Sequence, residues 1–419
     1  MADGGDSGRS PRDIVDAVSV FWQARYGRLL AELAATPRPA PSLFRSFFLG
    51  GFECSSHRRA HDRARVDVIA ATGHDARAAG DYRLLRQHGI RTVRDGLRWH
   101  LIGKDPGRLD WSSLDPMLDA ARETDTQVIW DLLHYGWPDW LDIWSADFVA
   151  RFTDFCVAAA ERIGTRTEGR RFYAPVNEIS FFAWSGGDVA YINPFARGRA
   201  DELKRQLARA AASAMAAIRA IDAQACFVHA EPVIQLAATD PRALYEAESY
   251  NRSQFDALDM IAGRRAPELG GRADYLDLAG VNYYHGNQWV HVGEGLPRGE
   301  RLYHGDPLYK PFRYLLMDSY AHFGRPIFVA ETGTEGEART GWLAYMCEEV
   351  RAAMRAGVPV EGICLYPVLN HPGWDDERNC PNGLIEFAGA DGPRTVYRPL
   401  ADELARQQAL FRSEFGIGA

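Results

Sequence analysis

Short apolar runs that favour β-strands alternate with amphipathic segments at helical spacing along most of the chain. The strand-like runs cover 47–54, 90–95, 127–134, 171–177, 225–230, 276–283, 326–331 and 361–367. The helical patterns that follow them lie near 76–88, 113–124, 146–163, 202–220, 241–261, 308–323, 341–356 and 396–411. Eight strands that are each followed by a helix predict an α/β fold, the (β/α)8 TIM barrel.

The pattern also predicts how the chain is divided. Residues 1–10 are polar and glycine-rich, which is typical of a disordered tail. Apolar residues at helical spacing from Ile14 to Leu33 predict a helix on the outside of the main domain, and the prolines after it indicate a linker. We therefore expect a tail over 1–10, an N-terminal helix and linker over 11–45, and one catalytic barrel over 46–419.

Charge and composition argue against several kinds of partner. The net charge of −8 argues against binding to nucleic acid or to an anionic membrane. The chain shows no signal peptide, and none of its stretches reaches the roughly 18 apolar residues of a membrane span. The six cysteines include no Cys-x-x-Cys pair, which predicts reduced thiols without disulfides or structural zinc. We therefore expect a cytoplasmic protein.

Two acidic residues stand at the ends of strand-like runs. Glu178 ends the run 172–178, and Glu331 ends the run 326–331. Strand C-termini form the rim on which α/β barrels carry their chemistry, and strands four and seven face each other across it. Hydrolysis of a glycosidic bond with retention needs two carboxyls about 5–5.5 Å apart, whereas inversion needs a wider gap. This pair predicts a glycosidase site.

Other polar residues are expected on the same rim. Arg94 ends the second strand and would keep one carboxylate charged and oriented, although taken alone it could equally form a structural ion pair with Asp131. Asn177 offers an amide suited to a sugar hydroxyl. Taken singly, His57 and His134 are typical of core or capping histidines and Tyr283 of a packing residue. It is the convergence of these groups on one rim that indicates a site.

Several motifs carry a resemblance to a known family. Val176-Asn177-Glu178 and Val329-Ala330-Glu331-Thr332-Gly333 resemble the acid/base and nucleophile motifs of the glycosidase barrel superfamily, clan A. Further segments resemble the family-1 glycoside hydrolases, the β-glucosidase group, and these are Arg94 to Trp99, Leu133 to Pro138, Gly280 to Tyr284, Tyr366 to Trp374 and Asn382 to Ile385. The likeness spans 47–386 in order, and it indicates a divergent member.

The resemblance implies roles for individual residues. Glu178 would be the acid/base and Glu331 the nucleophile, hydrogen-bonded by Tyr283. The substrate-binding and supporting residues would be Asn177, Arg94, His134, Tyr283, His57, Trp374, Trp99, Trp137 and Asn282. Among these, Trp99 or Trp137 would help to wall the sugar site, and Trp374 would stack on its outer side. Trp184 or Tyr191 would line the aglycone side.

Departures from the family pattern concern the sugar-binding groups. His57 stands where the family has a glutamine, and Gly373 stands where it has a glutamate that holds outer hydroxyls. We therefore expect a glycone other than standard glucose, because a lost hydrogen-bonding group changes which sugar fits. Either His57, Asp375 and Asp376 read a different hydroxyl pattern, or Gly373 leaves room for a larger glycone.

The expected function is hydrolysis of a β-linked glycoside by a retaining mechanism, with a small-molecule or oligosaccharide glycoside as substrate and neither metal nor organic cofactor. Two alternatives stay open: a transglycosidase that uses the same residues, and a non-catalytic carbohydrate-binding barrel. Sugar identity, linkage and oligomeric state are not predicted.

Overall fold

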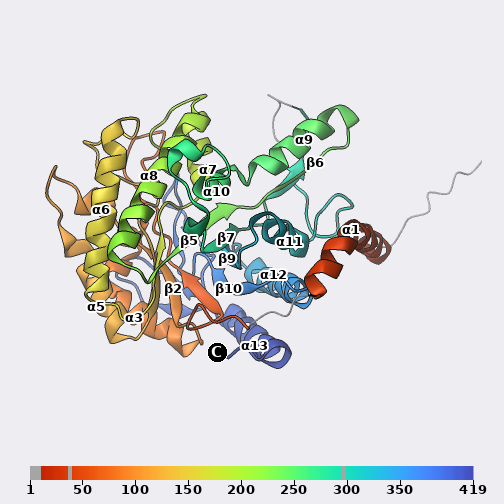
Figure 1. The fold of residues 1–419 in the computed structure, drawn as a ribbon. Helices are drawn as coiled ribbons and strands as arrows, with labels where there is room; N and C mark the ends of the chain where they lie inside the picture. The colour runs from red at the N-terminus through yellow and green to blue at the C-terminus, as the bar shows by residue number, and fades with distance from the viewer. Residues whose placement is uncertain (1–10, 36–39, 294–298, 419) are drawn as a thin grey trace, which may run out of the picture.

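The computed structural model describes residues 11–35, 40–293 and 299–418. At its centre a closed barrel of parallel strands is surrounded by helices (Figure 1). The barrel strands are β1 (Phe48–Gly51), β2 (Thr92–Gly96), β3 (Gln127–Asp131), β4 (Arg171–Ala174), β5 (Ala225–Pro232), β7 (Leu278–Asn282), β9 (Ile327–Thr332) and β10 (Val360–Leu365). They close in the order β1-β10-β9-β7-β5-β4-β3-β2, which confirms the predicted (β/α)8 barrel.

The helices around the barrel bury one apolar face each. The long ones are α3 (His74–Gln87), α5 (Asp115–Glu123), α6 (Ala146–Gly164), α8 (Ala200–Ile221), α11 (Phe312–Phe323), α12 (Ala338–Arg355) and α13 (Arg398–Phe415). In α6, Phe148, Phe152 and Phe155 are buried at helical spacing. The hydroxyl of Ser145 caps this helix by accepting a hydrogen bond from the amide of Phe148.

The helix predicted over 241–261 is two helices, α9 (Pro241–Ser253) and α10 (Asp256–Ile261). The break lies where polar side chains bind a short strand, β6 (Gln235–Ala237). The side chain of Asn251 accepts from the amide of Leu236 at 2.7 Å and donates to its carbonyl at 2.9 Å. β6 pairs with β8 (Gln288–Val290) in a small parallel sheet of its own, and Figure 1 shows α9 and β6 together at the edge of the molecule.

The N-terminal helix α1 (Pro11–Ala34) packs on α11, on the outside of the barrel as predicted. The ring of Tyr26 stacks on Tyr314 with centroids 4.6 Å apart, and its hydroxyl donates to Asp318 at 2.7 Å. The predicted tail 1–10 lies outside the described residues, and the division of the chain into tail, extension and barrel stays a prediction.

All six cysteines are buried free thiols. Within 11–35, 40–293 and 299–418, no helix combines the length and the apolar character that crossing a bilayer requires.

A buried cluster of charges holds β2 against the helices. The imidazole of His74 lies 2.8 Å from Asp81 on α3 and 2.8 Å from Asp95 on β2. Asp95 also accepts a hydrogen bond from Tyr82 at 2.6 Å, and Asp81 accepts one from Arg394 at 2.9 Å. Because side chains alternate along a strand, Asp95 faces this outer cluster, whereas the adjacent Arg94 on β2 faces the barrel interior.

Candidate active site

Glu178 follows β4 in a left-handed backbone conformation, with φ 45° and ψ 62°, directly before the short helix α7 (Ile179–Phe182). Non-glycine residues adopt this conformation rarely, and it is often found at functional sites. Its Oε1 accepts a hydrogen bond from Asn282 at 2.8 Å, and its Oε2 accepts one from Tyr135 at 2.7 Å. The residue is partly exposed.

Glu331 lies within β9, and only 4% of it is exposed. Its Oε1 accepts a hydrogen bond from Arg94 at 3.0 Å, and its Oε2 accepts one from the hydroxyl of Tyr284 at 2.8 Å. Both carboxylate oxygens of Glu331 are therefore held in place.

Asn282 connects the two carboxyls. On β7 it is the register partner of Glu331 on β9, so the two backbones lie side by side. Its side-chain amide nevertheless donates to Glu178. The two strand-end carboxyls that the sequence singled out therefore share one neighbouring residue.

Arg94 is the central cation of the site and is fully buried. Its Nη1 binds Glu331, and its Nη2 donates to Asp131 at 2.6 Å and to the amide oxygen of Asn177 at 3.0 Å. One guanidinium thus forms the ion pair with Asp131 and also contacts Glu331, and its role in keeping Glu331 charged stays a prediction.

The surroundings of the two carboxyls raise both of their pKa values toward neutral pH. Burial raises the pKa of Glu178 to about 7, although hydrogen bonds from Asn282 and Tyr135 lower it. Burial also raises the pKa of Glu331 to about 7; the charge of Glu178 adds to this effect, and Arg94 opposes it. Groups that affect each other in this way titrate as a pair.

Asn177 and His134 belong to the same network. Because the amide oxygen of Asn177 faces Arg94, its nitrogen faces Tyr135 at 3.0 Å and the Nε2 of His134 at 3.2 Å. The Nε2 of His134 therefore accepts, which leaves its proton on Nδ1, 3.0 Å from Asp131. A chain of hydrogen bonds thus runs from β3 to Glu178.

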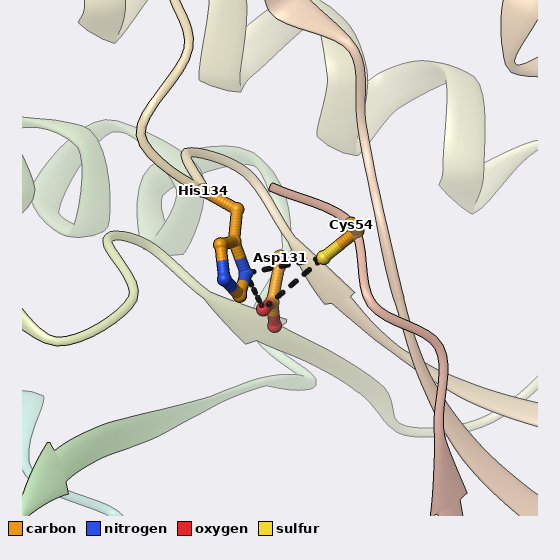
Figure 2. A group of neighbouring side chains, drawn as sticks. All are labelled: Cys54, Asp131 and His134. Carbon is orange, nitrogen blue, oxygen red and sulfur yellow. Dashed lines mark hydrogen bonds and ion pairs between the residues drawn. The ribbon is translucent and has the colours of Figure 1, made fainter. Parts of the chain in front are cut away.

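Cys54, Asp131 and His134 form a buried group of three possible metal ligands, which Figure 2 shows turned toward one another. Their chemistry does not fit a cation. The same Asp131 oxygen already binds the guanidinium of Arg94. Burial and the nearby Asp131 raise the pKa of the Cys54 thiol well above its usual range, and a metal prefers the thiolate. We interpret the group as a set of contacts that fixes the orientation of the His134 ring.

The expectation that Tyr283 donates a hydrogen bond to Glu331 is wrong. The hydroxyl of Tyr283 is 2.8 Å from that of Tyr309, it accepts from Gln288 at 2.7 Å, and its ring stacks on Phe312. The next residue, Tyr284, is the one that donates to Glu331. Successive side chains point to opposite sides of an extended chain, so only one of the two tyrosines can face the barrel interior.

The expectation that Trp99 or Trp137 walls the sugar site is also wrong in its contacts. Trp99 stacks on Phe155 of α6 with centroids 5.1 Å apart. The indole of Trp137 donates to the carbonyl of Leu141, and its ring packs against Phe148. Both tryptophans belong to the layer between barrel and helices, and it is Tyr135 that contacts Glu178.

His57 and Trp374 do lie near the site. Their ring centroids are 4.6 Å apart, and Trp374 lies 5.7 Å from the ring of Tyr135. The Nδ1 of His57 is buried without a hydrogen-bond partner. Burial lowers the pKa of His57 to about 4, so the ring is neutral at pH 7.

The sequence reasoning missed two further acidic residues at strand ends. Glu53 follows β1, and its Oε1 lies 3.8 Å from the Nε2 of His134. Glu231 lies near the end of β5 and accepts a hydrogen bond from the backbone amide of Ser180 at 3.1 Å. The signal that identified Glu178, an acid at the end of an apolar run, was present for both of them.

The fold is similar to that of several solved structures, among them two β-glucosidases. A monomer of a hyperthermophilic β-glucosidase mutant that forms a dodecamer in its crystal matches with a TM-score of 0.71 and 14% identity, over 88% of this chain and 100% of that one. The family-1 β-glucosidase from Thermotoga maritima matches with a TM-score of 0.69 and 16% identity, over 87% and 98%. The AHE enzyme from Alicyclobacillus herbarius matches with a TM-score of 0.71 and 19% identity, over 89% and 100%.

No family model and no curated protein matches the chain. At identities this low, likeness to solved structures establishes the architecture. This chain therefore has the (β/α)8 barrel fold that the two β-glucosidases share.

Proposed function

We propose that this protein is a retaining β-glycosidase that hydrolyses a β-linked glycoside by double displacement, with Glu178 as acid/base and Glu331 as nucleophile. The observation that carries the proposal is that two strand-end carboxyls lie beside one residue, Asn282, which donates to Glu178 and is the backbone register partner of Glu331. A retaining mechanism requires one carboxyl that can give a proton and one that stays ionised.

The contacts favour this assignment of the two roles. Glu331 touches a guanidinium, which stabilises its anion. Within 11–35, 40–293 and 299–418, the hydrogen bonds to the Glu178 carboxyl come from the neutral groups Asn282 and Tyr135. When the two carboxyls together bind one proton, that proton is therefore on Glu178.

In the first step a carboxylate oxygen of Glu331 forms a bond to the anomeric carbon while the bond to the leaving oxygen breaks. Glu178 gives its proton to that oxygen. In the second step the ionised Glu178 takes a proton from water, whose oxygen attacks the anomeric carbon and releases Glu331. Tyr284 and Arg94 hold Glu331 throughout. Asn177 and His134 would exchange their hydrogen bond to each other for hydroxyls of the bound sugar.

Two contacts support a choice between the two expectations about the glycone. A Cβ atom at Gly373 would lie 2.4 Å from Oδ1 of Asp376, so this carboxylate occupies the place where a side chain at 373 would begin. Asp375 accepts a hydrogen bond from Tyr191 at 2.7 Å. We therefore favour a changed set of hydrogen-bonding groups over simple extra room.

A panel of aryl β-glycosides tests the proposal, with gluco, galacto, manno, fuco, xylo, arabino and glucuronyl donors. We expect hydrolysis of at least one donor, with the β-anomer as the product first seen by NMR. If none of the donors is hydrolysed but sugar binding is measurable, the carbohydrate-binding barrel would be favoured. Transfer to an added alcohol in place of hydrolysis would favour the transglycosidase.

Variants then test the two roles. Glu331→Ala and Glu331→Gly should lose turnover, and azide should restore reaction to give a glycosyl azide of inverted configuration. Glu178→Ala should spare substrates with activated leaving groups and cripple the rest. A wild-type rate for Glu331→Ala would show that the nucleophile is another residue.

A further inference from the structure

The turn that contains Glu178 is held at two points by consecutive residues of β5. The amide of Glu178 donates to the carbonyl of Ala230 at 2.9 Å. Two residues on, the amide of Ser180 donates to the carboxylate of Glu231, at 3.1 Å from Oε2 and 3.4 Å from Oε1. The amide of Ile179 also interacts with this carboxylate.

The backbone of Glu178 needs such support. Its φ of 45° costs free energy in a residue with a Cβ atom. A left-handed residue at this point directs its side chain toward Asn282 and Tyr135. Without the contacts to β5, the strained backbone could relax and move the carboxyl away from them.

Glu231 is itself an unusual group. It is 4% exposed, and among the residues that the structure describes it takes part in no salt bridge. Burial raises its pKa to about 7, hydrogen bonds from Ser180 lower it, and Lys204 is a nearby charge that also lowers it. A buried carboxylate without a paired cation destabilises a fold, which makes a functional role the better explanation.

We infer that Glu231 is a positioning residue for Glu178: its carboxyl oxygens hold the left-handed turn that directs the Glu178 carboxyl, and the charge that Glu231 carries when ionised disfavours ionisation of Glu178. This inference rests on the proposed acid/base role of Glu178. The carboxyl of Glu178 accepts hydrogen bonds from Asn282 and Tyr135. The charges of Arg94, Glu231 and Glu331 act on it, and it acts on the hydroxyl of Tyr284. Within this set Glu231 is the charged group that also holds the backbone.

The variant Glu231→Gln separates charge from shape. Its amide oxygen can still accept from Ser180, but its charge is gone. We expect the pKa of Glu178, followed by carbon-13 NMR of its carboxyl, to fall by about half a unit or more, because a like charge has been removed. The wild-type curve should be broadened by the titration of Glu231, whereas the variant should show a simpler one.

Kinetics provide a second measurement. In kcat/KM the basic limb reports loss of the acid's proton, so it should move to lower pH in Glu231→Gln by the same amount as the NMR value. The loss should be larger for alkyl leaving groups than for dinitrophenyl ones, which need no protonation. Glu231→Ala also removes the acceptor, and should lower kcat further with little change in KM.

Glu349→Gln is the matched control. Glu349 is also buried, but its partner is Arg313 on the outer helices, so this variant should lose stability and leave the Glu178 titration unchanged. An unchanged Glu178 pKa in Glu231→Gln would overturn the inference, whatever its stability. Because NMR needs no turnover, a wild type without glycosidase activity would overturn the proposed function while the titration still decides the role of Glu231.

Discussion

The hydroxyl of Tyr284 donates to Oε2 of Glu331 at 2.8 Å, whereas the adjacent Tyr283 is turned away from it. A hydrogen bond to a charged group contributes about 1.5–3 kcal/mol. Tyr284→Phe should therefore lower kcat/KM by about 10- to 100-fold. Tyr283→Phe, measured beside it, should keep nearly full kcat/KM and lower the melting temperature. A larger kinetic cost at Tyr283 would contradict the structure.

The guanidinium of Arg94 binds Asp131, Asn177 and Glu331 at once. A lysine ammonium cannot reach all three, because it lacks the planar fork. Arg94→Lys should lower kcat/KM by about 100-fold and the free energy of unfolding by about 3 kcal/mol, since a buried ion pair is disrupted. Steady-state kinetics and urea unfolding measure the two effects. Arg162→Lys, which alters an ion pair outside the site, should change neither.

Asn282 stabilises the ionised form of Glu178 by donating to it, and so lowers its pKa. Asn282→Ala removes the donor, so the pKa of Glu178 should rise and the basic limb of kcat/KM should move to higher pH. This is opposite in direction to the shift expected for Glu231→Gln. The comparison is made by measuring kcat/KM against pH for both variants on one substrate. If the basic limb moved in the same direction in both variants, the assignment of Glu178 as the acid would be refuted.

The buried His74 makes stability depend on pH. Burial alone would lower its pKa, but Asp95 and Asp81 outweigh that effect and raise the pKa to about 9. An unfolded histidine titrates near 6.5. The contribution, about 3 kcal/mol, is therefore complete below about pH 6.5 and is lost as pH rises through 9. Urea unfolding at pH 6 and pH 10 should show this loss in the wild type.

His74→Asn should be less stable at pH 6 and should show a much smaller change between the two pH values. His322→Asn is the control, because that ring lies partly exposed on α11. Equal pH dependence in His74→Asn and the wild type would mean that His74 is not the group responsible.

Much of the architecture could be predicted because each barrel strand is a short apolar run with a helix after it. The break between α9 and α10 could not, since it depends on Asn251 meeting β6, and no local pattern shows that contact. Helix periodicity continues through 241–261, and the contact with the preceding strand β6 overrides it.

The candidate site was predictable in its strand ends and less so in its aromatic residues. Glu178, Glu331 and Arg94 occupy strand ends, and the structure joins them in one network. Which of Tyr283 and Tyr284 contacts Glu331 depends on which side chain faces the barrel interior where β7 ends. A shift of one residue along the strand exchanges the two. The strand-end rule applied consistently would also have selected Glu231.

Arg94 and Asp95 are consecutive, yet one binds the candidate nucleophile and the other belongs to the shell of helices. One peptide bond thus separates the residue that holds Glu331 from a series of charged side chains that ends at Arg394, close to the C-terminal helix. A substitution in this outer series would therefore act on the backbone next to Arg94 without replacing any group inside the barrel.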